Sequence, residues 1–257
     1  ARGPAQPRLA WRVQLQGGDA DETLLVAAQD GRLLDRWSNN ESAAATGTGK
    51  TLYSGNVAIG TNSIAGGYEM RDSSRGGGYT INAATGKTSG QIYKDADNSW
   101  GNNAVSDAVS AAADAHFGVA TTWDYYKNVH GRNGIANDGK GALSRVHYGR
   151  NYVNAYWSDG CFCMTFGDGG GSYGPLVDLD VAGHEMSHGV TSRSANLTYS
   201  GESGGLNEAT SDIFGTMVEF YANNASDGGD YLIGEKIYIS NPGNATALRY
   251  MFHPSLE

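Results

Sequence analysis

Short segments with alternating hydrophobic and polar residues occupy most of the first hundred positions. Residues 9–15 alternate, and residues 23–37 place the turn pair Asp30-Gly31 between two apolar segments, which is typical of a hairpin. Between residues 52 and 94, short β-prone pieces are broken by Gly and Asn. Closely spaced strands with frequent turn signals predict a mixed or antiparallel sheet.

The segment 38–51 interrupts this pattern, because it is small, polar and without apolar alternation. Such composition is typical of an exposed linker or cleavage region. We therefore expect a proteolytic cut during maturation, between Ser42 and Thr46.

Three later segments change to a helical period of three and four. Residues 104–129 predict a helix that ends at Gly131, and residues 179–194 predict a second helix with Asp180 near its start. Between them, residues 144–167 return to strand character. A third helix is predicted over residues 206–224, with an apolar stripe formed by Leu206, Ala209, Ile213, Met217, Phe220 and Tyr221.

Composition excludes two classes of partner. The 257 residues include 18 Lys and Arg against 27 Asp and Glu, a net charge of −9, which is unsuited to nucleic acid. No apolar run approaches the roughly 18 residues that a membrane helix needs. The 38 glycines indicate a loop-rich protein of the extracellular kind, and we expect a monomer.

The two cysteines lie together in Cys161-Phe162-Cys163. Three interpretations are open: a strained local disulfide, half of a metal site, or two free thiols. No second cysteine pair completes a tetrahedral sulfur site, so we favour the local disulfide over zinc.

Residues 184–188 read His-Glu-Met-Ser-His on the second predicted helix. Residues i and i+4 share one helix face, so His184 and His188 can bind one metal with Glu185 beside them. Twenty residues later, Glu208 and Asp212 have the same spacing. Two His and a Glu with an open fourth position form a catalytic zinc set, and Asn207 and Asp212 are candidates to orient the imidazoles.

At these residues the chain resembles the thermolysin-like family of secreted metallopeptidases. The resemblance runs from about residue 52 to residue 255, and it includes the motifs at 121–134 and 204–223 together with VHYG, NAYW and FGDG. Residues 1–44 look like the end of that family's propeptide with a cleavage linker. As a runner-up, they form an independent interaction module.

The resemblance implies an α+β fold of the zincin type. A β-rich N-terminal lobe, residues 45–178, precedes the zinc-binding helices and the start of a truncated C-terminal lobe, residues 179–257. On this interpretation most of the helical C-terminal lobe is absent, and with it a further histidine that supports the oxyanion, so we expect this chain alone to be a nearly inactive fragment.

The family's roles transfer where the residues match. His184, His188 and Glu208 would hold zinc, and Glu185 would act as general base toward the zinc-bound water. Tyr199 matches an oxyanion donor, Arg249 matches the arginine that binds the substrate carbonyl, and Asn154 and Ala155 match the strand edge that holds the substrate backbone. The apolar pocket beside them would be lined by Tyr173, Leu176, Val181 and Leu248.

Calcium is the second expected cofactor. Oxygen-only clusters suit calcium, and a group of acidic residues brackets the two helices. The candidate ligands are Asp180, Glu219, Asp227, Asp230 and Glu235. They resemble the family's calcium site, although Leu232 stands where an acidic residue is common.

The sequence therefore predicts a secreted zinc endopeptidase, made as a zymogen, that cleaves before bulky hydrophobic residues. Its partners would be protein or peptide substrates and its own propeptide. The alternative is a metal-binding protein of the same fold without turnover. Glu185 argues against that alternative, because a non-catalytic relative does not need the base.

Overall fold

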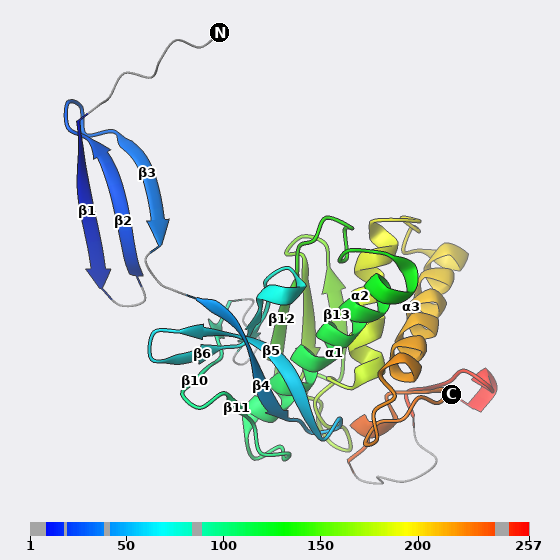
Figure 1. Ribbon diagram of the computed structural model, residues 1–257. Coiled ribbons are helices and arrows are strands. Elements are labelled where there is room, and N and C mark those ends of the chain that lie inside the picture. Colours follow the sequence, from blue (N-terminus) through cyan, green and yellow to red (C-terminus); the bar gives the residue numbers. More distant parts are fainter. Residues whose placement is uncertain (1–8, 18–19, 39–41, 84–88, 240–246, 257) are drawn as a thin grey trace.

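The computed structural model describes residues 9–17, 20–38, 42–83, 89–239 and 247–256 (Figure 1). A three-stranded antiparallel sheet comes first, and it stands apart from the main body in Figure 1. It consists of β1 (Ala10–Gly17), β2 (Ala20–Ala27) and β3 (Leu33–Ser38), with β2 in the middle. The hairpin predicted around Asp30-Gly31 is confirmed between β2 and β3.

The linker prediction for residues 38–51 is wrong over most of its length. β4 (Ala43–Lys50) pairs antiparallel with β5 (Asn56–Ile64) along all eight residues. The two buried residues of β4 are Gly47 and Gly49. Because glycine has no apolar side chain, the alternation of buried and exposed positions along β4 cannot be seen in the sequence. The expected boundary between residues 44 and 45 thus falls inside a strand.

Two sheets form the β-rich part of the main body. The five-stranded sheet has the order β10 (Lys94–Asp95), β6 (Gly67–Glu69), β5, β4, β11 (Ser99–Trp100). The second sheet has the order β13 (Ala155–Ser158), β14 (Cys163–Gly167), β12 (Leu143–Tyr148), β8 (Gly78–Asn82), β7 (Arg71–Asp72), and β9 (Gln91–Ile92) also pairs with β8. No strand among the described residues pairs with the outer edge of β13, so that edge can accept a further strand.

Two helices pack against these sheets, and a third helix covers those two helices (Figure 1). α1 (Ala108–His130) contacts both sheets and α2 (Leu179–Ser192), and it ends at Gly131 as predicted. α3 (Gly201–Ala222) packs mainly on α2. Short elements complete the chain: η1 (Ser73–Arg75), β15 (Leu232–Ile233), η2 (Glu235–Ile237), β16 (Arg249–Tyr250) and η3 (Pro254–Leu256). Among the described residues, no helix is both long and apolar enough to cross a membrane.

The third helix differs from its prediction in extent and in orientation. It begins at Gly201, five residues before the predicted start. The predicted apolar stripe lies largely in solvent, with Leu206 56% and Ile213 50% exposed. The buried face instead carries small and polar residues: Gly204, Asn207, Ser211, Asp212, Gly215, Thr216, Val218 and Glu219.

Close contact between α2 and α3 explains why the residues on the buried face of α3 are small. A Cβ added to Gly183 would lie 2.9 Å from the Gly215 Cα, and one added to Gly215 would lie 2.5 Å from the Asp180 carbonyl oxygen. Glycine at position 183 is unfavourable for the helix itself. It is needed here because a side chain at this position would keep α2 and α3 apart.

We expect Gly215→Ala to destabilise the protein by about 1–3 kcal/mol, because the methyl group would overlap α2 backbone that cannot rotate away. Gly205→Ala is the matched control on the same helix, where nothing lies within 4 Å of the added Cβ. That variant should be neutral or gain up to about 1 kcal/mol of helix propensity. Urea unfolding of the two variants measures both effects, and equal stabilities would contradict the close packing.

Candidate metal centre and cleft

Three metal-ligating side chains converge where α2 crosses α3. His184 Nε2 lies 2.9 Å from His188 Nε2 and 3.2 Å from Glu208 Oε2, and His188 Nε2 lies 3.5 Å from Glu208 Oε1. The one-turn spacing on α2 places both imidazoles on the face toward α3, as predicted.

These three ligands fit a zinc ion. Nitrogen and oxygen ligands about 2.0–2.1 Å from a tetrahedral zinc lie roughly 3.3 Å from one another. The three separations agree with that spacing. Three protein ligands also leave one coordination position for water or substrate, which is the composition of a catalytic site.

Polar partners hold each imidazole by its other nitrogen. His184 Nδ1 donates to Asp212 Oδ1 at 2.6 Å, and His188 Nδ1 donates to Asn207 Oδ1 at 2.7 Å. Ser211 Oγ also lies 3.1 Å from His188 Nδ1, a contact that the sequence analysis missed. These bonds orient Nε2 of both rings toward Glu208.

The charged forms of the ligands stabilise each other. Burial lowers the pKa of His184, but its hydrogen bonds to Asp212 and Glu208 outweigh burial and raise that pKa to about 9. The same contacts hold the pKa of Glu208 well below its usual range. A metal that binds here must displace the imidazole proton, so binding releases protons.

Glu185 is buried beside the ligands, with 6% of the residue exposed. Burial raises the pKa of its carboxyl group, although the nearby imidazoles and a hydrogen bond from the Trp157 backbone oppose the rise. A carboxylate with an elevated pKa next to a metal set has the properties of a general base.

A cleft runs along α2 over this centre. Its lining includes Asn154, Ala155, Leu176, Val181, Tyr199, Leu248 and Arg249, together with the metal set and Glu185. Arg249 forms two hydrogen bonds to Asp212, each 2.7 Å long, and it is therefore held at the cleft wall. Tyr199 donates to Glu208 through its hydroxyl group.

Tyr173 was predicted to line the apolar pocket, and the structure places it elsewhere. Its hydroxyl lies 2.8 Å from that of Tyr238, and its ring packs on the Tyr238 ring. It lines a separate pocket with Leu52 and His147, away from Leu176, Val181 and Leu248. The backbone pairing of Tyr173 with Gly170 and Tyr238 turns it to that side.

A second cluster contains only carboxylates. One group comprises Asp178, Asp180 and Glu235, and another comprises Glu219, Asp227 and Glu235, each with ligand oxygens within 4.8 Å. Both oxygens of Glu219 and both of Asp227 are buried without a hydrogen-bond partner. Buried unpartnered anions are strongly unfavourable, so this geometry suits a hard cation with oxygen ligands.

Two members of this cluster differ from the prediction. Asp178 was missed, although its position immediately before a predicted helix was a capping signal; its carboxylate accepts from the Leu179 backbone N–H. Asp230 belongs to neither group, because its Oδ1 accepts from the Leu232 backbone N–H at 2.6 Å.

Burial and, after it, mutual repulsion shift the pKa values of this cluster. Burial, followed by the neighbouring carboxylates, raises the pKa of Glu219 to about 11 and that of Glu235 to about 8. Lys236 Nζ lies 3.8 Å from Asp227, but it is one cation against five acids. A divalent cation would compensate this charge.

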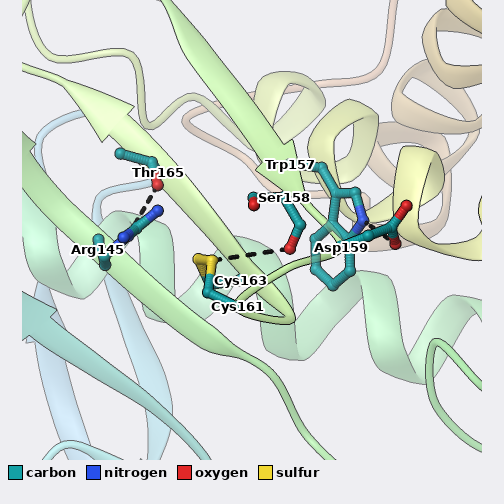
Figure 2. Close-up of a disulfide and its surroundings, with 7 residues drawn as sticks. All are labelled: Arg145, Trp157, Ser158, Asp159, Cys161, Cys163 and Thr165. Atoms are coloured by element: carbon teal, nitrogen blue, oxygen red, sulfur yellow. Dashed lines mark hydrogen bonds between the residues drawn. A yellow bond between two sulfur atoms is a disulfide. The ribbon is translucent and has the colours of Figure 1, made fainter. Parts of the chain in front are cut away.

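The local disulfide favoured for the cysteine pair is present. Cys161, in the turn after β13, is bonded to Cys163 at the start of β14, and Cys161 Sγ lies 3.7 Å from the Ser158 carbonyl oxygen (Figure 2). The pair is therefore no part of a metal site.

Comparisons with known proteins find matches along most of the chain. The family model for the thermolysin metallopeptidase catalytic domain matches residues 46–192, and the model for the thermolysin metallopeptidase alpha-helical domain matches residues 195–257.

Individual relatives are similar over nearly the whole chain. Transglutaminase-activating metalloprotease from Streptomyces mobaraensis is 54% identical over 257 residues, which cover 98% of this chain and 33% of the relative. Thermolysin from Alicyclobacillus acidocaldarius subsp. acidocaldarius is 39% identical over 272 residues, with coverages of 97% and 47%. The chain thus spans a third to a half of the length of these relatives.

A solved structure is also similar. The precursor of protealysin, a metalloproteinase from Serratia proteamaculans, superposes with a TM-score of 0.54 at 33% identity, and the match covers 67% of this chain and 52% of that one.

Proposed function

The chain belongs to the thermolysin family of metallopeptidases, and on this premise we propose that it carries the active site of a secreted, zinc-dependent endopeptidase. The observation that carries the proposal is the convergence of His184, His188 and Glu208 beside the buried carboxyl group of Glu185. The function is hydrolysis of peptide bonds in protein or peptide substrates.

Each residue near the metal set has a role in this proposal. Zinc, when bound, lowers the pKa of a water molecule and polarises the peptide carbonyl. Glu185 accepts the proton of the attacking water and later delivers it to the leaving amine. Tyr199 donates a hydrogen bond to the developing oxyanion, while Asp212 and Asn207 keep the two imidazoles in orientation.

Substrate binding uses the exposed edge of β13. Asn154 and Ala155 lie at its start in the cleft, so an extended peptide can add to this edge as a further strand. Arg249 binds the carbonyl that follows the scissile bond. The pocket of Leu176, Val181 and Leu248 receives the side chain of the substrate residue that follows the scissile bond. This favours cleavage before bulky hydrophobic residues.

Calcium is the second proposed cofactor. Glu219, Asp227 and Glu235 would bind one part of the site, and Asp178 and Asp180 another, because their carboxylate oxygens form two groups that share Glu235. Filling the cluster ties α2, α3 and the segment after α3 together.

The sheet of β1 to β3 would be the end of a propeptide that is removed during maturation. A cut between Ser42 and Thr46 stays our prediction. Ala43 to Thr46 pair with β5 on one side only, and Ser42 and Ala43 are exposed. Sequencing the N-terminus of the secreted enzyme checks this, and a start upstream of Arg36 would contradict it.

We expect one zinc per chain and its loss in Glu208→Ala, since two imidazoles without the carboxylate form an incomplete set. Glu202→Ala is the matched control, an exposed glutamate on the same helix. Metal analysis after dialysis measures both variants. Full zinc retention in Glu208→Ala would refute the ligand assignment independently of any activity assay.

A further inference from the structure

An ordered carboxylate lies at the end of the cleft beyond His188. Asp159 follows β13, and its Oδ1 accepts three hydrogen bonds: from Trp157 Nε1 at 2.9 Å, Ser192 Oγ at 2.8 Å and an Arg193 guanidinium nitrogen at 2.6 Å. Asp159 and Ser192 both belong to the cleft lining. None of the peptidase roles above uses this group.

The turn that contains Asp159 is held from two sides. On one side, the Cys161–Cys163 disulfide closes the turn (Figure 2). Phe162 stands between the two cysteines at φ 51°, with its ring 5.2 Å from the Trp157 ring. On the other, the Trp157 indole lies so close to α2 that a Cβ on Gly189 would be 2.9 Å from it. Asp159 is therefore presented by a rigid turn.

The Asp159 carboxylate presents negative charge to the cleft. Its side chain is 52% exposed, and no hydrogen bond is recorded for its Oδ2 among the described residues. Arg193, its ion-pair partner, is not among the residues that line the cleft. The other lining carboxylates, Glu185 and Glu208, belong to the metal centre. Among the described residues that line the cleft, Asp159 is the charged residue that belongs neither to the metal centre nor, like Arg249, to the side of the apolar pocket.

The position of Asp159 along α2 relates it to the substrate. Val181 and the apolar pocket lie before His184 on α2, whereas Ser192 lies four residues after His188, about 6 Å further along the axis. An extended peptide rises about 3.3 Å per residue, so this distance corresponds to about two residues. Because the apolar pocket takes the residue after the scissile bond, Asp159 faces the residues before it.

We propose that Asp159 forms a subsite for a basic side chain, Lys or Arg, at the second residue before the scissile bond. The inference rests on the proposed peptidase function. It assigns a specificity-determining role to Asp159, and it assigns to the Cys161–Cys163 turn the role of positioning that carboxylate.

The test uses two peptides with Leu after the scissile bond, which differ only in Lys or its uncharged analogue norleucine two residues before it. The intact protein should prefer the Lys peptide by roughly twofold to fivefold in kcat/KM, as expected for a partly exposed ion pair, and added salt should reduce the ratio. Asp159→Asn should bring the ratio to about one, because kcat/KM falls more for the Lys peptide than for the norleucine peptide. Asp138→Asn, outside the cleft lining, is the matched control and should keep the preference.

Three outcomes would overturn the inference. One is an intact protein that cleaves both peptides equally, and this outcome does not depend on whether any variant folds. Another is an unchanged ratio in Asp159→Asn. The third is an equal loss on both peptides, which would identify Asp159 as merely structural. Absence of any cleavage by the full-length protein that contains this chain would instead contradict the proposed function itself, and the inference with it.

Discussion

Glu185→Gln is expected to reduce peptidase kcat by a factor on the order of 100 to 10,000 while leaving the zinc content unchanged. The amide keeps the size of the side chain and removes the group that accepts a proton from water. Glu185 binds no metal in the proposed arrangement, since the ligands are His184, His188 and Glu208. Steady-state hydrolysis of a peptide substrate, with metal analysis of the same sample, measures both quantities.

Glu202→Gln on the exposed first turn of α3 is the control for this charge change, and its activity should equal that of the unaltered protein. If Glu185→Gln retained full activity, the assigned base would be wrong. If the unaltered full-length protein that contains this chain bound zinc and hydrolysed no peptide, the alternative of a metal-binding protein without turnover would hold.

Removal of calcium, with zinc kept in the buffer, is expected to lower the Tm by roughly 5–10 °C. A cation that binds only the folded state adds RT ln(1 + [L]/Kd), about 2.7 kcal/mol at a concentration of 100 Kd. Each kcal/mol corresponds to about 2–4 °C for a chain of this size. The physical cause is the set of buried, unpartnered oxygens on Glu219 and Asp227. Thermal unfolding along a calcium titration measures the shift.

Substitutions of two aspartates distinguish a calcium site from an acidic loop that binds no cation. Asp178→Asn should lose most of the calcium response, because it removes a carboxylate from one of the two groups. Asp230→Asn should retain the response, because Asp230 lies outside both groups and its Oδ1 is bonded to the Leu232 backbone. A Tm that calcium does not change in the unaltered protein would leave the cluster without a cation role.

The local chemistry of the metal centre could be predicted from the sequence. The spacing of His184 and His188 determines that both lie on one face of α2, because a helix repeats every 3.6 residues. The same period places Asp212 one turn after Glu208. The C-terminal end of α1 was predictable for a similar reason, since Gly131 is a local capping signal. Its start was predicted too early, at residue 104, whereas the helix begins at Ala108 after the cap Asp107.

Contacts between distant segments were decided only by the tertiary structure. The apolar stripe of α3 indicated a face packed in the core, yet the packed face is small and polar, because Gly183 and Gly215 bring α2 close and the metal ligands need that side. Likewise, β4 lacks an apolar alternation because glycine occupies its buried positions. Hydrophobic periodicity reports which residues avoid water, whereas a face filled by carboxylates and glycine is stable only through partners far away in sequence.

The composition of the acidic cluster and of the cleft wall was also decided by contacts between segments that are distant in sequence. Asp178 joins Glu235 across more than fifty residues, and Tyr173 turns to Tyr238 instead of the cleft. Asp159 meets Ser192 because α2 passes the turn after β13. The sequence alone determined the identity and local spacing of the reactive groups through helix geometry and capping. The tertiary structure decided which of them share a site, because charge and hydrogen bonding act over a few ångströms in space, irrespective of separation along the chain.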